Sequence, residues 1–309
     1  MLSEEDKYLF DLNGYIVIKG VFSPEEVAAA NDAITNHMPS ANERIDDAIR
    51  NTKRGTGMGG NGKDGRIDLG GVLQWGEQSK FFHSVLDHPK LVPYYNEFCG
   101  KGYRMDHMPF CIVQNKGSEG FNLHGGTIDV SSGEYNHFLA YTYNHGQIRS
   151  NLLAVAVALC PHPEGGGGFC VVKGSHKSNF KAPPAMIQGD AYREHVQQVV
   201  SDPGDVIIWS EGTVHGALPW MNDHQRRVAL FRFAPSTCAY GRSYMEEGNP
   251  MWPEGCYDGM TERQKAVLQP PFNTRLDRVQ LDDEGGTHVE SRSKAKKEFD
   301  KKVFGTSYF

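Results

Sequence analysis

The chain has 309 residues, 39% of them hydrophobic and 23% charged, and a formal net charge of −6. This length suits one large domain with insertions, and the acidic balance argues against a nucleic-acid-binding surface. No apolar stretch reaches the roughly 18 residues of a membrane span. The start of the chain is acidic and polar, unlike a secretory signal. The six cysteines contain no CxxC pair, which fits a reducing compartment. We therefore expect a soluble, cytoplasmic protein with no nucleic-acid or membrane partner.

The first hundred residues carry helix signals around a short strand and a loop. Ser3 precedes three acidic residues and indicates a helix start, and Gly14–Lys19 has the β-branched and aromatic content of a strand. Ser23–Glu26 combines an N-cap serine, a proline and a capping-box glutamate, which predicts a helix to about Asn36. Asn51–Gly71 is rich in Gly, Asn, Lys and Arg without periodicity. We predict a mobile loop there, close to the functional site.

From about residue 103 the pattern changes to short strands separated by Gly and Pro turns. The predicted strands are Tyr103–Gln114, Gly120–His124, Leu152–Cys160, Gly168–Lys173, Gln197–Val200, Asp205–Trp209 and Val228–Pro235. Gly165–Gly168 lacks the Lys-Ser/Thr and the helix of a phosphate loop, so we interpret it as a hairpin turn. The pattern predicts a mainly β fold with flanking helices, as a closed sheet or jelly roll.

We expect a single domain over residues 1–309. Residues 1–100 would form a helical N-terminal support with its loop, residues 103–235 the β core, and residues 236–309 a C-terminal extension. The basic run Lys294–Lys302 is interpreted as a solvated terminal helix.

Two imidazoles and one guanidinium stand out at predicted strand ends. His124 closes one strand, His215 ends another, and Arg226 lies on the strand that follows. Imidazole binds iron, and a planar guanidinium binds a carboxylate through two hydrogen bonds. Because these strands can face one barrel interior, the pattern predicts an Fe(II) site with a 2-oxo acid cosubstrate. The other histidines that we weighed are interpreted as structural or surface residues: His107, His137, His145, His162, His176 and His224.

The third metal ligand stays open at this stage. A two-His-one-carboxylate site commonly has its acid two residues after the first histidine, and Gly126 stands there. Asp129 could curl back, because Gly125 and Gly126 allow a tight turn. Alternatively, Gly126 leaves a position open for a halide such as chloride, another acid completes the site, or the site binds iron weakly or is degenerate. We prefer Asp129 as the third ligand, with His124 and His215.

Two more residues are placed near this site by strand geometry. Side chains alternate with period two, which puts Asn122 on the face of His124 and suggests a role in cofactor binding. Glu211 lies four residues before His215, so in a continuous strand it would be about 13 Å away. We therefore interpret Glu211, like Gly126, as lining the substrate pocket, unless a bulge intervenes.

With these residues in view, the chain resembles the phytanoyl-CoA dioxygenase family of Fe(II)/2-oxoglutarate oxygenases. The matching pieces are Phe10–Glu26, Gly165–Lys177, Pro203–Val206, His215-Gly216 and Arg226 with its strand. The resemblance implies a double-stranded β-helix, which is a cupin-like jelly roll with flanking helices. It also implies that His124 and His215 bind iron and that Arg226 pairs with the distal carboxylate of 2-oxoglutarate. The Gly126 departure resembles the small-molecule halogenases of the same superfamily.

The implied reaction is the oxidation of an unactivated C–H bond of a small molecule by molecular oxygen, with hydroxylation as the outcome. Halogenation at an open position beside Gly126 is the alternative. A non-catalytic small-molecule-binding protein on a degenerate barrel would not turn over 2-oxoglutarate, and a cupin-like isomerase would bind metal but ignore 2-oxoglutarate. Arg226 argues against both of these. The expected assembly is a monomer or homodimer.

Overall fold

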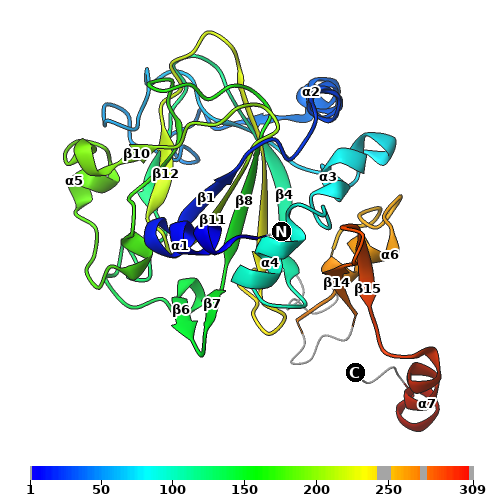
Figure 1. Ribbon diagram of the computed structural model, residues 1–309. Helices are drawn as coiled ribbons and strands as arrows, with labels where there is room; N and C mark the ends of the chain where they lie inside the picture. Colours follow the sequence, from blue (N-terminus) through cyan, green and yellow to red (C-terminus); the bar gives the residue numbers. More distant parts are fainter. Residues whose placement is uncertain (1, 242–251, 272–276, 306–309) are drawn as a thin grey trace.

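The computed structural model describes residues 2–241, 252–271 and 277–305 (Figure 1). The helices are α1 (Glu4–Asn13), α2 (Pro24–His37), α3 (Lys80–Ser84), α4 (Val92–Phe98), α5 (Pro184–Ile187), α6 (Glu262–Val267) and α7 (Lys294–Phe304). The strands are β1 (Tyr15–Ile18), β2 (Asn42–Glu43), β3 (Ile67–Leu69), β4 (Arg104–Gln114), β5 (Phe121–His124), β6 (Tyr141–Asn144), β7 (Gln147–Ser150), β8 (Leu153–Ala158), β9 (Gly168–Val171), β10 (Gln197–Gln198), β11 (Val206–Ser210), β12 (His215–Leu218), β13 (Arg226–Ala234), β14 (Arg278–Leu281) and β15 (Thr287–Glu290). None of the helices in these ranges combines the length and apolar character that crossing a lipid bilayer requires.

Two antiparallel sheets face each other and enclose the interior of the barrel. The larger sheet has the order β1-β11-β8-β13-β4-β3-β2, and the smaller one has the order β10-β9-β12-β5. Helices α2, α3 and α4 lie on the outer side of the larger sheet, and the smaller sheet lies on the opposite side (Figure 1). This arrangement is a jelly roll with flanking helices, which confirms the predicted fold class.

Strand β8 shows how the sequence builds both a core and a cavity. Its larger side chains, Leu153, Val155 and Val157, pack into the core between the sheet and the helices. Its alternate positions, Ala154 and Ala156, face the smaller sheet. Because successive side chains in a strand point to opposite faces, small residues on one face leave space inside the barrel while large residues fill the outer core.

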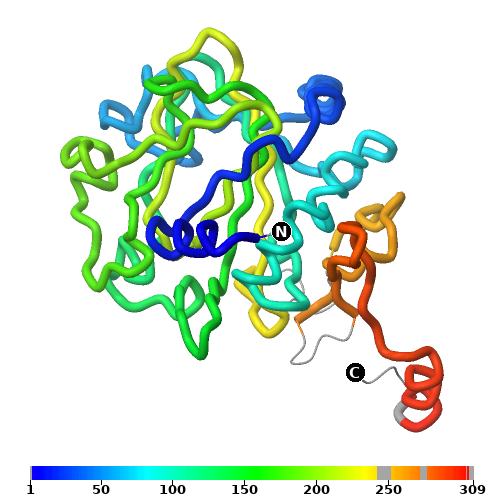
Figure 2. Tube along the Cα trace, viewed as in Figure 1, coloured from blue at the N-terminus to red at the C-terminus, as the bar shows by residue number. Residues whose placement is uncertain are grey.

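The N-terminal region contributes strands as well as helical support. The predicted capping box forms at Ser23 before α2, and the helix start predicted at Ser3 is a second capping box before α1. Between these helices, β1 pairs with β11 and forms one edge of the larger sheet, and Figure 2 shows this segment in dark blue running along the barrel. Farther along, β2 and β3 extend the other edge beside β4. The first hundred residues therefore complete the larger sheet.

The segment predicted as a mobile loop is irregular up to Arg66 but is tied to the barrel. The buried carboxylate of Glu119 accepts hydrogen bonds from the backbone nitrogens of Asn51 and Thr52 and from the Thr52 hydroxyl. Arg50 lies 3.4 Å from the same carboxylate, and both side chains are buried. The segment that follows enters β3. Residues 50–66 are thus a covering segment that Glu119 holds against the barrel.

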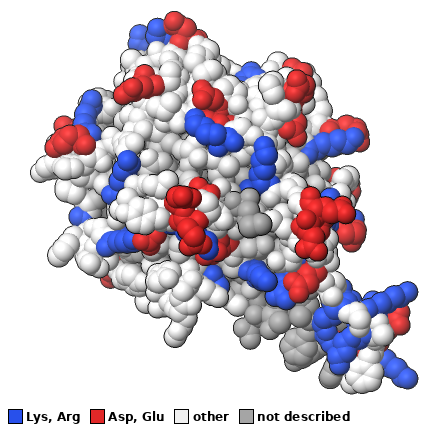
Figure 3. Space-filling view, viewed as in Figure 1, with Lys and Arg blue, Asp and Glu red and all other residues white. Residues whose placement is uncertain are grey.

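Two further expectations change in the structure. Gly165–Gly168 is a turn, but it leads from the larger sheet to the smaller one, because β8 and β9 belong to different sheets, so the hairpin interpretation was wrong. The C-terminal extension contains the β14–β15 hairpin, which composition did not indicate. The basic run forms α7, which projects from the body and carries the cluster of Lys and Arg side chains at the lower right of Figure 3. Elsewhere on that face, acidic and basic side chains are interspersed.

Candidate metal centre and cosubstrate pocket

Three side chains of types that can bind a metal ion meet between the sheets: His124, Glu211 and His215. Their nearest ligand atoms all lie within 4.8 Å of one another. His124 is the last residue of β5 and His215 the first of β12, and the two are direct partners in the sheet, with ring centroids 4.2 Å apart. The strand pairing therefore sets the two imidazoles side by side, and the turn before β12 adds the carboxylate.

Glu211 reaches the imidazoles because the chain turns between it and His215. Strand β11 ends at Ser210, and residues 211–214 form the connection to β12. The carboxylate Oε2 of Glu211 lies 3.4 Å from Nε2 of His215. The separation of about 13 Å expected for one continuous strand was thus wrong, and His215 begins a strand where the sequence predicted that it would end one.

Backbone carbonyls fix which ring nitrogen of His124 and of His215 faces the other candidate ligands. Nδ1 of His124 lies 2.9 Å from the carbonyl oxygen of Asn122, and Nδ1 of His215 lies 2.7 Å from that of Thr213. A carbonyl oxygen only accepts, so each Nδ1 carries the proton and donates it. Each Nε2 is then an unprotonated lone-pair donor, which is the form that binds a metal.

Charge and burial favour the metal-binding protonation states. Burial lowers the pKa of His124, with a further contribution from His215, to about 3, and burial also lowers the pKa of His215. Burial alone would raise the pKa of Glu211, but the Arg232 guanidinium and the two imidazoles outweigh it and lower the pKa to about 2. Arg232 Nε donates to Oε1 of Glu211 at 2.8 Å and so orients the carboxylate. At neutral pH the group therefore offers two neutral imidazoles and one carboxylate.

The structure does not bring Asp129 to the imidazoles. Its Oδ1 accepts hydrogen bonds from the backbone nitrogens of Ser131 and Ser132 and from the Ser132 hydroxyl, which closes a local turn. Gly125 and Gly126 do form the expected tight turn, with φ of 76° and 91°, but this turn leads into the 129–133 loop.

The two glycines do not turn Asp129 toward the imidazoles, as was expected, but allow close packing against the Glu211 turn. A Cβ at Gly125 would lie 2.5 Å from the carbonyl oxygen of Glu211, and Gly126 donates its backbone N–H to the same oxygen at 3.1 Å. A Cβ at Gly126 would first meet Val214 and the Ile128 carbonyl. The glycine pair therefore allows the Glu211 turn to pack directly against the residues that follow His124.

A bulge in β5 changes the position of Asn122. The register between β12 and β5 shifts between the pairs His215–His124 and Ala217–Phe121. As a result Phe121 lines the cavity together with His124, whereas Asn122 does not. Asn122 contributes its backbone carbonyl to the orientation of His124, and strict alternation, which placed its side chain in the site, does not apply here.

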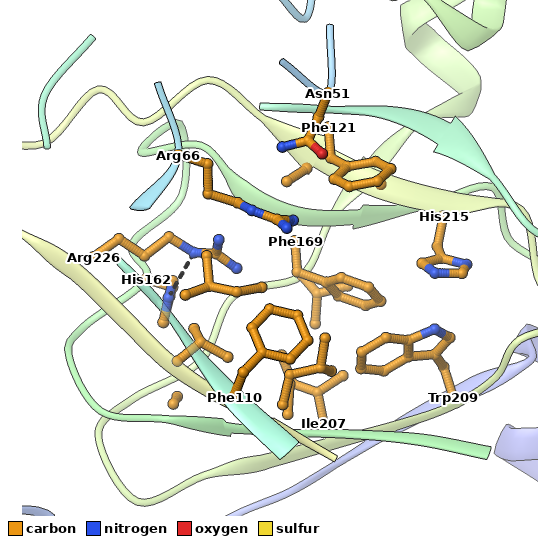
Figure 4. Close-up of a pocket in the computed structure, with 18 of the residues that line it drawn as sticks. Asn51, Arg66, Phe110, Phe121, His162, Phe169, Ile207, Trp209, His215 and Arg226 are labelled. Carbon is orange, nitrogen blue, oxygen red and sulfur yellow. Dashed lines mark hydrogen bonds between the residues drawn. The ribbon is translucent and has the colours of Figure 1, made fainter. Parts of the chain in front are cut away.

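The imidazoles open into a cavity of about 370 Å³ between the sheets, with Arg226 and His215 on opposite sides of it (Figure 4). Arg226 is buried, its Nε donates to His162 at 3.3 Å, and its Nη1 donates to the side-chain oxygen of Gln114. Burial lowers its pKa to about 10, so it remains a cation at neutral pH. Within the described residues Arg226 has no acidic partner. A buried cation without a counter-charge is costly, and a bound anion would offset that cost.

The cavity contains polar residues that the sequence interpretation missed. Arg66 and Asn51 enter it from the segment predicted as a mobile loop, and His162 was taken as structural. The polar-apolar alternation from Arg66 to Leu69 was a signal for β3 that the Gly-rich surroundings obscured. The remaining lining is largely apolar and aromatic, including Phe110, Phe169, Ile207 and Trp209.

A comparison of the sequence with protein families decides the family. The profile of the phytanoyl-CoA dioxygenase family (PhyH) matches residues 10–228. The chain belongs to this family. No curated protein sequence is significantly similar to it.

Several solved structures share the fold. The structure of HygX from Streptomyces hygroscopicus with nickel and 2-oxoglutarate bound is 20% identical, with a TM-score of 0.62 over 81% of this chain and 95% of that one. SnoK, a non-heme α-ketoglutarate-dependent carbocyclase from nogalamycin biosynthesis, is 18% identical, with a TM-score of 0.54 over 82% and 95%. The epimerase SnoN from nogalamycin biosynthesis is 16% identical, with a TM-score of 0.54 over 83% and 94%. At these identities the likeness concerns the fold.

Proposed function

We propose that this protein is an Fe(II)/2-oxoglutarate-dependent oxygenase that hydroxylates an unactivated C–H bond of a small molecule. The observation that carries the proposal is the convergence of His124, Glu211 and His215 within 4.8 Å. The cavity beside them also holds Arg226, a cation with no acidic partner among the described residues. Family membership and the 2-oxoglutarate bound by HygX support the choice of cosubstrate.

The donor set fits Fe(II). Two imidazole Nε2 atoms and one carboxylate form the two-His-one-carboxylate set of non-heme Fe(II) oxygenases, which leaves further coordination positions open. His124, Glu211 and His215 would hold the iron, which together with 2-oxoglutarate would supply the activation of molecular oxygen that hydroxylation needs. Glu211 in this role replaces Asp129, because only Glu211 shares the group with the two histidines.

The other residues of the site bind, orient and exclude water. Arg226 would bind the distal carboxylate of 2-oxoglutarate bidentately, because its neutral partners His162 and Gln114 leave its charge unmatched. Arg232 holds Glu211 in place. The aromatic and aliphatic walls keep the cavity poor in water, which strengthens each of these charged contacts.

Hydroxylation is favoured over halogenation by the position of Glu211. The halogenase alternative, with its chloride, depended on a missing carboxylate beside Gly126. Glu211 provides a carboxylate from the neighbouring turn, so a vacancy at residue 126 does not imply a vacancy at the metal. The same complete donor set argues against a degenerate, non-catalytic barrel.

The test is the visible charge-transfer band of the Fe(II)–2-oxoglutarate chelate under anaerobic conditions, followed by succinate formation in air. We expect the band in the wild type, its loss or severe weakening in Glu211→Ala and His215→Ala, and its retention in Asp129→Ala. Asp129→Ala is the matched control, since it removes a nearby carboxylate that lies outside the group. A band that survives Glu211→Ala and disappears in Asp129→Ala would reject the ligand assignment. A wild type without any band would reject the function.

A further inference from the structure

A row of cationic side chains crosses one end of the cavity beyond Arg226. Arg226 pairs with Gln114 across β13 and β4. Ile67 pairs with Val113 across β3 and β4, so Arg66, one residue earlier, lies opposite Gln114. Residues directly opposite one another in antiparallel strands share a face, and Arg66 and Arg226 accordingly both line the cavity. Figure 4 shows the two guanidinium groups near each other, on the side away from His215.

Arg66 is held rigidly in an apolar setting. It is 7% exposed, and its guanidinium carbon lies 5.1 Å from the ring centroid of Phe121 and 5.8 Å from that of Phe110. Its Nη2 donates to Asp68 at 2.9 Å, and its buried Nε lies 2.8 Å from the same carboxylate without making a hydrogen bond. No hydrogen bond of its Nη1 is present within the described residues. The aromatic faces orient the cation while excluding water. A buried guanidinium with one edge that makes no hydrogen bond is suited to bind an acceptor in the cavity.

A second orphaned donor lies beside it. Asn51 lines the same cavity, and its Nδ2 is buried without a hydrogen-bond partner. Figure 4 places its amide above the Arg66 guanidinium, near Phe121. Buried amide donors are rarely left unpaired. Two donor groups facing one space indicate that an acceptor belongs there.

The charges around Arg66 do not balance. Arg44 and Arg66 share a single carboxylate, Asp68, with Arg44 Nε 2.6 Å and Arg66 Nε 2.8 Å from its oxygens. The neighbouring Glu119 is already matched by Arg50. One positive charge therefore remains on the Arg44–Arg66 pair.

The cosubstrate does not supply the missing negative charge. In the proposed function, one carboxylate of 2-oxoglutarate is taken by the metal and the other by Arg226. The second acid that the Arg44–Arg66 pair lacks would then come from another molecule in the cavity. A single unmatched charge suits a carboxylate better than a phosphate monoester, which carries about two negative charges at neutral pH.

We propose that Arg66, supported by Arg44 and Asn51, binds a carboxylate of the primary substrate, so the protein acts on a small organic acid. The apolar part of that acid would lie along Phe110 and Phe121, between the carboxylate anchor and the metal. The volume of about 370 Å³, which also has to hold 2-oxoglutarate, limits the part of the acid inside the cavity to a small group. This proposal rests on the proposed function, because it assigns 2-oxoglutarate to Arg226.

The test compares an acid probe with its neutral counterpart. Hexanoate and hexanamide are titrated by calorimetry into protein saturated with 2-oxoglutarate and Mn(II), which occupies the metal site without turnover. We expect hexanoate to bind at least about tenfold more tightly than hexanamide, as a charge-assisted hydrogen bond implies. This comparison needs no variant, so it holds even if a substitution at Arg66 prevents folding. Equal binding of the two probes, or no binding of either, overturns the proposal.

Variants test whether the preference for hexanoate depends on Arg66. Arg66→Gln should abolish the preference for hexanoate and Arg66→Lys should keep part of it. Arg54→Gln removes a guanidinium of the same segment that pairs with Asp47 at the exposed surface, and it should behave as the wild type. A full preference in Arg66→Gln overturns the proposal.

The affinity for 2-oxoglutarate separates the two possible sources of the carboxylate. It should change by less than about threefold in Arg66→Gln, well below the tenfold of a lost charge-assisted bond. A loss of 2-oxoglutarate binding as large as that in Arg226→Gln assigns Arg66 to the cosubstrate and overturns the proposal. A wild type that binds no 2-oxoglutarate rejects the proposed function instead, and the probe comparison is then read on the protein without 2-oxoglutarate.

Discussion

Replacing Arg226 by glutamine tests the cosubstrate assignment most directly. The side chain is 4% exposed and lacks an acidic partner within the described residues, so a bound carboxylate would be its first counter-charge. A hydrogen bond to a charged group contributes about 1.5–3 kcal/mol. Taking about 2 kcal/mol, the dissociation constant for 2-oxoglutarate should rise about 30-fold, since 1.4 kcal/mol corresponds to tenfold. Glutamine remains able to pair with Gln114, which limits the disturbance of the fold.

The assay is ligand-induced stabilisation with Mn(II) present. At a 2-oxoglutarate concentration of 100 times the wild-type dissociation constant, binding stabilises the wild type by about 2.7 kcal/mol. The same concentration should stabilise Arg226→Gln by only about 0.9 kcal/mol. Urea unfolding with and without 2-oxoglutarate measures both values, and the difference between them does not depend on how the substitution changes the stability of the free protein.

Arg227 provides the matched control. It is the next residue on β13 but points away from the cavity, where its Nη1 donates to the carbonyl of Asn31 and the hydroxyl of Thr35 on α2. Arg227→Gln is expected to lower the stability of the free protein while keeping the full stabilisation by 2-oxoglutarate. Unchanged stabilisation in Arg226→Gln, or an equal loss in both variants, would refute the assignment.

Three further outcomes are expected. Burial lowers the pKa of His176 to about 4 from 6.5, and the ring Nε2 bonds to the Asp11 carbonyl. As the pH falls, the unfolded chain therefore binds a proton on this histidine before the folded protein does, which should lower the stability by about 2 kcal/mol at pH 5. Urea unfolding of His176→Gln, compared with the exposed control His195→Gln, measures this loss. Glu119→Gln breaks the tether of the covering segment, so limited proteolysis should cut residues 50–66 in the variant and spare them in the wild type. Ala156→Leu fills the cavity from β8, and should abolish 2-oxoglutarate binding while shifting stability by no more than about 1–3 kcal/mol; binding that persists would move the cosubstrate elsewhere.

The parts of the molecule that could be predicted from sequence are those set by local chemistry. The capping box at Ser23 and the strands β8 and β11 follow from patterns that act over a few residues. His124, His215 and Arg226 could also be picked out from the sequence by their residue types and order, although of the two histidines only His124 lies at the strand end that was predicted for it. The structure brings all three to one cavity, and their roles as ligands and anchor remain proposals.

The parts that could not be predicted depend on how the chain turns between strands. Glu211 was placed about 13 Å from His215 on the assumption of a continuous strand, whereas a turn after Ser210 brings their side chains to 3.4 Å. Asn122 was placed in the site by strict alternation, which the bulge in β5 interrupts. Arg66 was hidden because the segment before it is held by Glu119, which lies far away in sequence and accepts hydrogen bonds from Asn51 and Thr52. Such tertiary contacts leave no periodic signal in the segment that they fix.

The position of Glu211 gives the glycine at residue 126 a physical reason. In a His-x-Asp arrangement the first strand would supply an imidazole and the carboxylate together. In the proposed site the turn between β11 and β12, together with the first residue of β12, supplies the carboxylate and the second imidazole, and β5 supplies His124 across the strand pairing. The Glu211 turn must then come into backbone contact with residues 125 and 126, where it accepts the Gly126 N–H and leaves no room for a Cβ on Gly125. An aspartate at residue 126 would therefore add a second acid beside Glu211, and in the proposed site the carboxylate comes instead from the turn before β12.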